Sequence, residues 1–250
     1  MTAPTPEALA AVLVAHGDRG GRSPNAALEA QAAAVRTLTG LDFVTTGVLK
    51  GDRTIEHALS DAAATGASRI AVYPLFMADG YFVQKVRERM LAIGLTPEPA
   101  LLAPLGLDPG LPEVLVQESI ATAETNGVDP AAARLLVVGH GSKLGPASAS
   151  ATRKAAARAA IARRFASVAT AFLEEEPFLE DVLRATAATP TVVAGFFFGD
   201  GMHAGEDVPE AIAEARANAL YTGAIGNSPA VAPLIAAAFA NISGPRPSSG

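Results

Sequence analysis

The residues of this chain that could do chemistry are four histidines, and the sequence contains no cysteine. The absence of cysteine excludes a disulfide framework, a zinc ribbon, a thiolate nucleophile and an iron–sulfur cluster. Any metal ion must therefore bind through histidine, aspartate or glutamate. Neutral imidazole is a ligand for Fe, Co, Ni and Zn, and it exchanges protons near neutral pH. These side chains could bind a divalent ion, accept protons, or do both.

An internal repeat relates two of the histidines. The run Leu13–Arg19 is echoed by Val137–Lys143 at an offset of 124 residues, which pairs His16 with His140. The same offset pairs Gly21 with Gly145, Val44 with Val168, Thr46 with Thr170, Leu49 with Leu173, Glu56 with Glu180 and Leu59 with Leu183. Further along, an offset of 121 aligns Leu75–Gly80 with Phe196–Gly201. The chain is a tandem duplication with its seam near Thr125–Asp129.

Each half must position these residues with alternating strands and helices. Apolar runs that predict strands lie at Ala11–Ala15, Phe43–Leu49, Ile70–Phe76, Ala100–Leu102, Leu135–Val138, Ser167–Leu173, Thr191–Phe198 and Ala219–Tyr221. Alanine-rich helical stretches alternate with those of the first half, at Ala26–Leu38, Thr54–Ala64, Phe82–Ala92 and Leu111–Ala123. The strand runs are continuously apolar, which is typical of parallel strands covered on both faces. The fold class predicted is α/β.

The predicted architecture is two similar doubly wound modules, each with a four-stranded parallel sheet. We expect them to be related by a pseudo-twofold axis, with a cleft between them. Their predicted boundaries are 1–126 and 127–242, followed by a disordered tail at 243–250. With a strand order of 2-1-3-4, ligands bind beyond the strand ends where the order reverses. His140 and His203 follow the first and third strands of the second module, so both are expected there.

Three motifs of the second module occur in a characteristic order. They are His-Gly-Ser-Lys at His140–Lys143, Phe-Leu-Glu at Phe172–Glu174, and the glycine-rich segment Gly199–Pro209. This set resembles the class II tetrapyrrole chelatases, and most closely the sirohydrochlorin cobaltochelatase and ferrochelatase group in its long two-module form. The resemblance extends from about Val12 to Phe239. It implies a chelatase-like fold and a metal chelatase, which is a lyase.

The resemblance also implies the site residues. It makes His140 and His203 the pair that handles the metal and the pyrrole protons, with Glu174 as the accompanying carboxylate, which either binds the metal or takes a proton. The matching first-module positions hold His16, Lys50 and Phe82, so one working site per chain is expected. Candidate tetrapyrrole contacts are Ser142, Lys143 and His16. For His16, a structural role is an equal alternative.

The function that the resemblance implies is insertion of Co²⁺ or Fe²⁺ into sirohydrochlorin or a related precorrin, in cobalamin or siroheme biosynthesis. The metal is then a substrate, with Ni²⁺ as a further candidate, and no organic cofactor is expected. A monomer is expected, because the duplication supplies the second module within one chain. A non-catalytic tetrapyrrole or metal carrier is the alternative, and it would explain a degenerate first module.

Composition narrows the partners. Half of the residues are hydrophobic, 18% are charged, and the formal net charge is −6. Such a chain can bury a large core, and its acidity disfavours nucleic acid as a partner. No apolar run reaches the about 18 residues of a membrane span, and a signal-peptide flank is lacking, so we expect a cytoplasmic protein with no membrane partner.

Three acidic or basic features of the sequence can be interpreted as structural or surface residues, without a role in catalysis. Asp207, before Val208 and Pro209, is predicted to cap a helix. The run Glu174–Glu176 is otherwise typical of a solvated surface, and His57 is expected on a helix surface.

A histidine phosphatase is disfavoured, because no arginine directly precedes His16 or His140.

Overall fold

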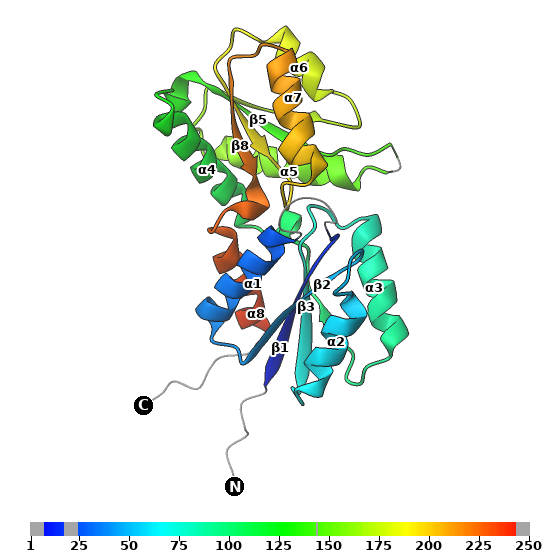
Figure 1. The fold of residues 1–250 in the computed structure, drawn as a ribbon. Coiled ribbons are helices and arrows are strands. Elements are labelled where there is room, and N and C mark those ends of the chain that lie inside the picture. Colours follow the sequence, from blue (N-terminus) through cyan, green and yellow to red (C-terminus); the bar gives the residue numbers. More distant parts are fainter. Residues whose placement is uncertain (1–7, 18–24, 144, 244–250) are drawn as a thin grey trace, which may run out of the picture. The chain divides into compact units, whose positions relative to one another are not determined.

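The described chain forms two compact α/β units, each built on one four-stranded sheet (Figure 1). The structure is a computed structural model that describes residues 8–17, 25–143 and 145–243. All neighbouring strands pair in parallel, in the orders β2-β1-β3-β4 and β6-β5-β7-β8. The predicted strand order is therefore confirmed in both sheets. Asp18, Arg19 and residues 244–250 of the predicted tail lie outside the described residues, whereas Ser243, predicted as the first residue of that tail, ends the last helix.

The elements follow the predicted alternation. The strands are β1 (Leu9–Ala15), β2 (Phe43–Val48), β3 (Arg69–Pro74), β4 (Ala100–Leu101), β5 (Arg134–Gly139), β6 (Ser167–Phe172), β7 (Thr191–Gly195) and β8 (Ala219–Ala224). The helices are α1 (Ala26–Thr39), α2 (Ile55–Ala64), α3 (Tyr81–Ile93), α4 (Leu111–Thr125), α5 (Ala147–Ile161), α6 (Leu179–Ala185), α7 (Val208–Glu214) and α8 (Val231–Ser243). Every predicted strand is present, with ends that differ by three residues or fewer.

The central strands carry the core of each unit. All residues of β1 and of β5 are buried, because parallel strands between two helical layers face apolar side chains on both sides. Consecutive right-handed crossovers place α1 on one face of the first sheet and α2 with α3 on the other. The described helices include none that is long and apolar enough to cross a bilayer.

The last helix of each sequence repeat packs in the unit of the other repeat. The first unit contains α8 from Ala232 onward, and the second contains α4 together with the segment Phe76–Gly80. On α8, the ring of Phe239 lies 6.1 Å from that of Tyr73 on β3. On α4, Glu118 accepts a hydrogen bond from Ser228 at 2.5 Å.

The compact units therefore divide the chain differently from the modules predicted at 1–126 and 127–242. Because the two sheets are copies of one another, each offers an equivalent apolar face to a terminal helix. An exchange of identical elements then costs little burial, as in domain swapping. The pseudo-twofold relation between the modules stays a prediction.

Candidate active site

His140 directly follows β5, at the carboxyl end of the second sheet. The strand ends at Gly139, where α5 packs so closely that a Cβ atom would collide with Thr152. Gly141 then turns the chain with a positive φ of 73°, a conformation that favours glycine. The carbonyl of His140 accepts the backbone N–H of Glu174 at 2.9 Å, which ties the loop to the end of β6.

His203 begins a π-helical turn, His203–Asp207, that leads directly into α7. The N–H of Val208 donates to the carbonyl of His203, five residues earlier. In the first unit the matching helix α3 is regular, and its buried Val83 and Val86 are three residues apart. The corresponding buried residues, Ala204 and Val208, are four apart. The π turn therefore adds one residue, and such turns are frequent at functional sites.

The two histidines of this unit face each other. Their Nε2 atoms lie 3.1 Å apart, and their rings meet edge to face with centroids separated by 4.4 Å. The prediction that His140 and His203 lie together beyond the strand ends is therefore confirmed. The side chains of His203 and Asp207 are 43% and 40% exposed, so a ligand from solvent can reach the pair.

The partners of the Nδ1 atoms assign the tautomers. Nδ1 of His140 lies 2.9 Å from the carbonyl oxygen of Gly141, and Nδ1 of His203 lies 2.7 Å from Oδ2 of Asp207. A carbonyl and a carboxylate only accept, so both Nδ1 atoms carry the proton. In the neutral rings both Nε2 atoms then present lone pairs to each other. Such an arrangement calls for a shared proton or a cation between them.

The separation of the two Nε2 atoms suits a metal ion. An ion about 2.1 Å from each nitrogen, at a separation of 3.1 Å, would be bound with an N–metal–N angle of about 95°. That angle is typical of neighbouring ligands in an octahedral site. Two imidazoles leave the other coordination positions free for water or for incoming pyrrole nitrogens.

The first unit preserves half of this arrangement. His16 follows β1, its Nδ1 lies 3.1 Å from the carbonyl of Gly17, and its carbonyl accepts the N–H of Lys50 at 2.9 Å. The ring facing His16 belongs to Phe82, at the position that matches His203, with centroids 4.8 Å apart. An aromatic hydrocarbon offers no lone pair, so this unit has no imidazole pair.

The other predicted site residues lie nearby on the second unit's loops. Glu174 is exposed on the turn after β6, and Lys143 is exposed two residues beyond Gly141. Ser142 is half-buried, and its backbone N–H donates to Glu175 at 3.0 Å. Within the described ranges, no three or more His, Asp or Glu side chains form a group suited to hold a metal. The role of Glu174 as a third ligand therefore stays a prediction.

Two residues have contacts that the sequence patterns did not indicate. The prediction that Asp207 caps a helix is wrong: its side chain makes no cap hydrogen bond, because α7 continues the π turn, and it bonds His203 instead. Glu175 belongs to a run interpreted as solvated, yet it accepts two hydrogen bonds. A difference between the repeats could have indicated it, since the position matching Glu175 is Gly51. His57 is exposed, as predicted.

The segment before the π turn is held against the end of β8. The carboxylate of Asp200 accepts the N–H of Ala224 at 3.4 Å and the side-chain amide of Asn227 at 2.5 Å. The hydroxyl of Tyr221 on β8 is buried, with no hydrogen-bond partner in the described part of the chain. Burial, reinforced by the negative charge of Asp200, raises the pKa of Tyr221 well above its ordinary value. These contacts fix the segment that carries His203.

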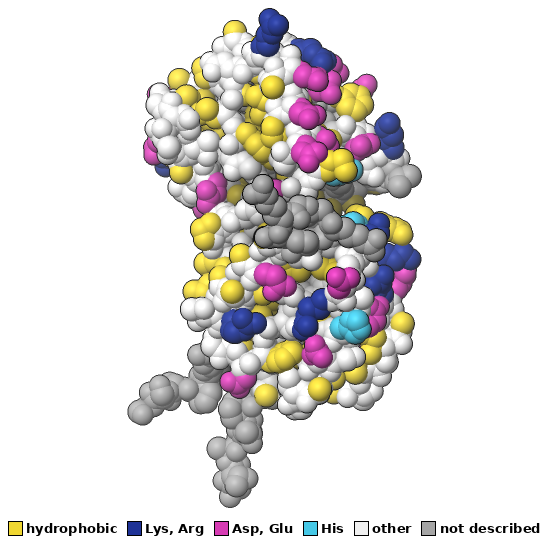
Figure 2. Space-filling model, in the orientation of Figure 1, with side chains coloured by type: hydrophobic (Ala, Val, Ile, Leu, Met, Phe, Trp, Pro, Cys, Tyr) yellow, Lys and Arg dark blue, Asp and Glu magenta, His cyan; other side chains and the backbone are white. Residues whose placement is uncertain are grey.

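Acidic side chains surround the His203 helix on the surface. Figure 2 shows Asp and Glu gathered over this face of the second unit, and the exposed carboxylates of α6, the π turn and α7 are Glu180, Asp181, Glu206, Glu210 and Glu214. Arg184 pairs with Glu180 at 3.1 Å and with Asp181 at 3.6 Å, so part of this negative charge is neutralised within α6.

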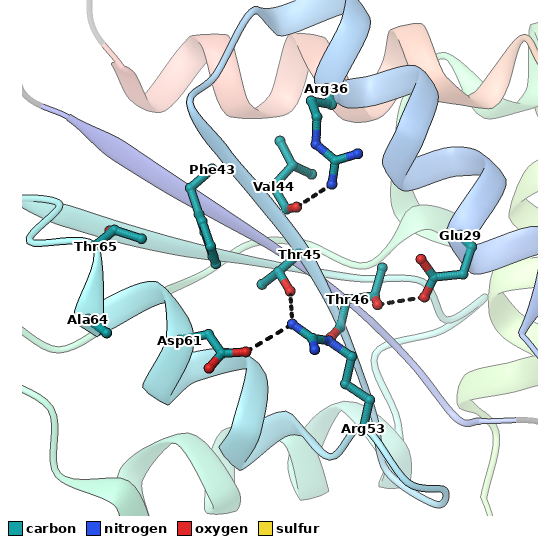
Figure 3. Close-up of a pocket in the computed structure, with 10 residues that line it drawn as sticks. All are labelled: Glu29, Arg36, Phe43, Val44, Thr45, Thr46, Arg53, Asp61, Ala64 and Thr65. Atoms are coloured by element: carbon teal, nitrogen blue, oxygen red, sulfur yellow. Dashed lines mark hydrogen bonds and ion pairs between the residues drawn. The ribbon is translucent and has the colours of Figure 1, made fainter.

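A cavity of about 650 Å³ lies elsewhere, along the edge strand β2 of the first unit (Figure 3). Arg36 donates to the carbonyl of Val44 at 2.6 Å, and Arg53 donates to the carbonyl of Thr46 at 2.9 Å. Arg53 also pairs with Asp61 at 3.0 Å. These guanidinium groups cover carbonyls that an edge strand would otherwise expose, which blocks pairing with another strand. The cavity contains no histidine and is separate from the candidate site.

The fold and the histidine pair define a class: a two-module chelatase, with a parallel sheet of order 2-1-3-4 in each module. The sequence model of the CbiX family matches residues 10–122 and again 134–242. The chain therefore belongs to the CbiX family, with two copies of the family's module in tandem. The duplication that the sequence predicted is confirmed by this double match.

The chain is also similar to chelatases that have a name or a solved structure. A protein of Halobacterium salinarum named probable sirohydrochlorin cobaltochelatase is 26% identical over 226 residues, covering 80% of this chain and 75% of the relative. A solved CbiX, described as the terminal enzyme of siroheme biosynthesis in denitrifying bacteria, is 32% identical, with a TM-score of 0.76 and coverage of 93% and 98%. SirB from Bacillus subtilis with Fe³⁺ is 19% identical, with a TM-score of 0.81 and coverage of 94% and 96%, which shows the shared fold.

Proposed function

We propose that this protein inserts Co²⁺ or Fe²⁺ into sirohydrochlorin. As a member of the CbiX family it is a metal chelatase; the choice of metal and tetrapyrrole is our proposal. The observation that carries it is the pair of Nε2 atoms, 3.1 Å apart, that face each other with their Nδ1 atoms already engaged. The names of the Halobacterium and CbiX relatives support sirohydrochlorin as substrate, and B. subtilis SirB has been solved with iron and with cobalt.

In the proposed reaction, His140 and His203 bind the incoming ion and displace part of its water shell. Insertion then exchanges the ion for the two pyrrole N–H protons, so two protons must leave the macrocycle. Each Nε2 has one lone pair, which can bind the ion first and accept a proton after the ion has moved to the ring. We place Glu174 as the accompanying carboxylate, and Ser142, Lys143 and His16 as tetrapyrrole contacts.

The test measures the rate of sirohydrochlorin metallation from the change in absorbance, with Co²⁺, Fe²⁺, Ni²⁺ and Zn²⁺ under identical conditions. We expect the protein to accelerate insertion of Co²⁺ or Fe²⁺ over the protein-free rate, and the His140→Ala variant to lose the acceleration. Binding of sirohydrochlorin or metal without acceleration for any of the four ions would instead support a carrier.

We further propose that one chain is the working unit, since both copies of the module are present in it. Light scattering coupled to size exclusion tests this, with a mass near 25.3 kDa expected. A stable dimer at the concentrations used for metallation would contradict it. We place the reaction in the cytoplasm, which fractionation of the producing cells would test.

A further inference from the structure

The peptide group between Gly141 and Ser142 is engaged at both ends. Its carbonyl oxygen accepts from Nδ1 of His140 at 2.9 Å, and its N–H donates to Oε2 of Glu175 at 3.0 Å. A peptide N–H that donates to a carboxylate polarises its own carbonyl, which makes that oxygen a stronger acceptor. Glu175 therefore acts on His140 indirectly, by polarising the peptide carbonyl that accepts the hydrogen bond from Nδ1 of His140. Asp207 accepts a hydrogen bond from Nδ1 of His203 directly. A carboxylate therefore supports the Nδ1 side of each imidazole.

Glu175 is itself held in place. Its Oε1 accepts from Arg153 of α5 at 3.2 Å, and the guanidinium carbon of Arg153 lies 4.7 Å from the ring centroid of Phe172. The side chain of Glu175 is 22% exposed against 50% for Arg153, so the carboxylate is the more buried partner. It also packs on Gly141, where a Cβ atom would collide with the Glu175 side chain. A half-buried carboxylate with two hydrogen-bond donors differs from a solvated surface glutamate.

The first module lacks this arrangement. At the positions that match Glu175 and Arg153 it has Gly51 and Glu29, and Glu29 instead accepts from Thr46 at 2.7 Å. His16 keeps its contact with the carbonyl of Gly17, and position 51 has no side-chain carboxylate. The Glu175–Arg153 pair therefore belongs to the module that has both imidazoles.

We propose that Glu175, held by Arg153, is a positioning residue for His140, acting through the Gly141–Ser142 peptide. It keeps the His140 proton on Nδ1 and aims the Nε2 lone pair at the ion. This role rests on the proposed function only for its use in catalysis, because tautomer and metal affinity can be measured without a tetrapyrrole. Loss of such an outer hydrogen-bond partner typically lowers metal affinity about 10–100-fold.

The experiment compares Glu175→Ala and Glu175→Gln with the wild type. Glutamine keeps an acceptor for the Ser142 N–H but removes the charge, so we expect about 3-fold weaker Co²⁺ binding, against about 10-fold for alanine. Co²⁺ absorption titration gives these affinities. Long-range ¹⁵N NMR of the histidine rings gives the Nδ1-protonated fraction of His140, which should fall in the order wild type, Gln, Ala, while that of His203 stays constant. Glu180→Ala, which removes an exposed ion pair with Arg184 in the same unit, is the matched control and should change neither quantity.

The proposal is overturned if both Glu175 variants keep the wild-type His140 tautomer, whatever their Co²⁺ affinity. A loss equal to that of Glu180→Ala would also overturn it, since Glu175 would then be an ordinary surface ion pair. If Glu175→Ala unfolds, as judged by circular dichroism, the isosteric glutamine variant decides alone. Absence of sirohydrochlorin metallation by the wild type, with the tautomer shifts as expected, would remove the proposed function and leave the role of Glu175 intact.

Discussion

The ring of Phe82 lies edge-on to the ring of His16, with centroids 4.8 Å apart, at the position where the second module has His203. Both modules therefore have two rings packed edge to face at these matching positions. Only the second module has an imidazole at both of them. The hydrocarbon ring can pack against an imidazole, but it can neither bind an ion nor accept a proton. We therefore expect substitutions of the ring residues in the second module to lower metallation more than substitutions in the first.

Removal of either imidazole from the second module should abolish most metallation. We expect His140→Ala and His203→Ala each to lower the rate at least about 100-fold, because a single imidazole binds the ion weakly. His16→Ala should lower it less than about 5-fold. Initial rates of sirohydrochlorin metallation measure this. An equal loss from His16→Ala would contradict a single working site.

Asp207 should tune the affinity of His203 for metal. Asp207→Ala removes the acceptor for the Nδ1 proton and frees the ring to rotate, so Co²⁺ binding should weaken about 10-fold or more. Asp207→Asn keeps an oxygen acceptor and should lie between. Glu206→Gln, at the exposed neighbouring position, is the control. Equal Co²⁺ affinities for the alanine variant and the control would show that the carboxylate does not support the ring.

Phe82→His restores the missing ring type in the first module. The new imidazole would face His16, so some Co²⁺ binding should appear in a protein whose own pair is removed by His140→Ala and His203→Ala. The affinity should stay at least about 10-fold below that of the native pair, because α3 is a regular helix without a carboxylate at the position of Asp207. Titration of the triple variant against the double variant measures it. Co²⁺ affinity equal to the native site would show that the outer carboxylates are dispensable.

Glu174→Lys tests the proposed third residue with a side chain that the first module already contains at the matching position, Lys50. Both residues are exposed, so the fold should survive. An ammonium near the ion replaces attraction by repulsion, and we expect metallation to fall at least about 10-fold while metal-free sirohydrochlorin still binds. Glu174→Gln should fall between. Metallation at the wild-type rate would leave the site as a histidine pair alone.

Phe239→Ala tests whether α8 completes the first unit. The ring is fully buried near Tyr73, so its loss should lower the free energy of unfolding by about 3–5 kcal/mol. Urea unfolding followed by circular dichroism measures this. Ile161→Ala on α5, where the side chain is 78% exposed, is the control and should change stability by less than about 0.5 kcal/mol. A similarly small effect at Phe239 would mean that α8 contributes little to the packing.

Much of the architecture was readable from local patterns. Apolar runs such as Leu135–Val138 predict buried strands because a parallel strand between two helical layers must be apolar on both faces. The repeat offset then requires both sheets to have the same order, and strand ends bring His140 and His203 to one edge. These conclusions depend on residue type and spacing, which the sequence contains directly.

The tertiary structure decided the rest. Which sheet α4 and α8 cover could not be predicted, because the two faces are equivalent in sequence and only the path of the connections selects between them. Asp207 carried the pattern of a helix cap, and a one-residue π turn directed its carboxylate to His203 instead. Glu175 carried the pattern of a solvated run, and the positive φ of Gly141 turned the next N–H toward it. Hydrogen bonds of this kind depend on backbone directions at the ångström scale, which composition and periodicity do not specify.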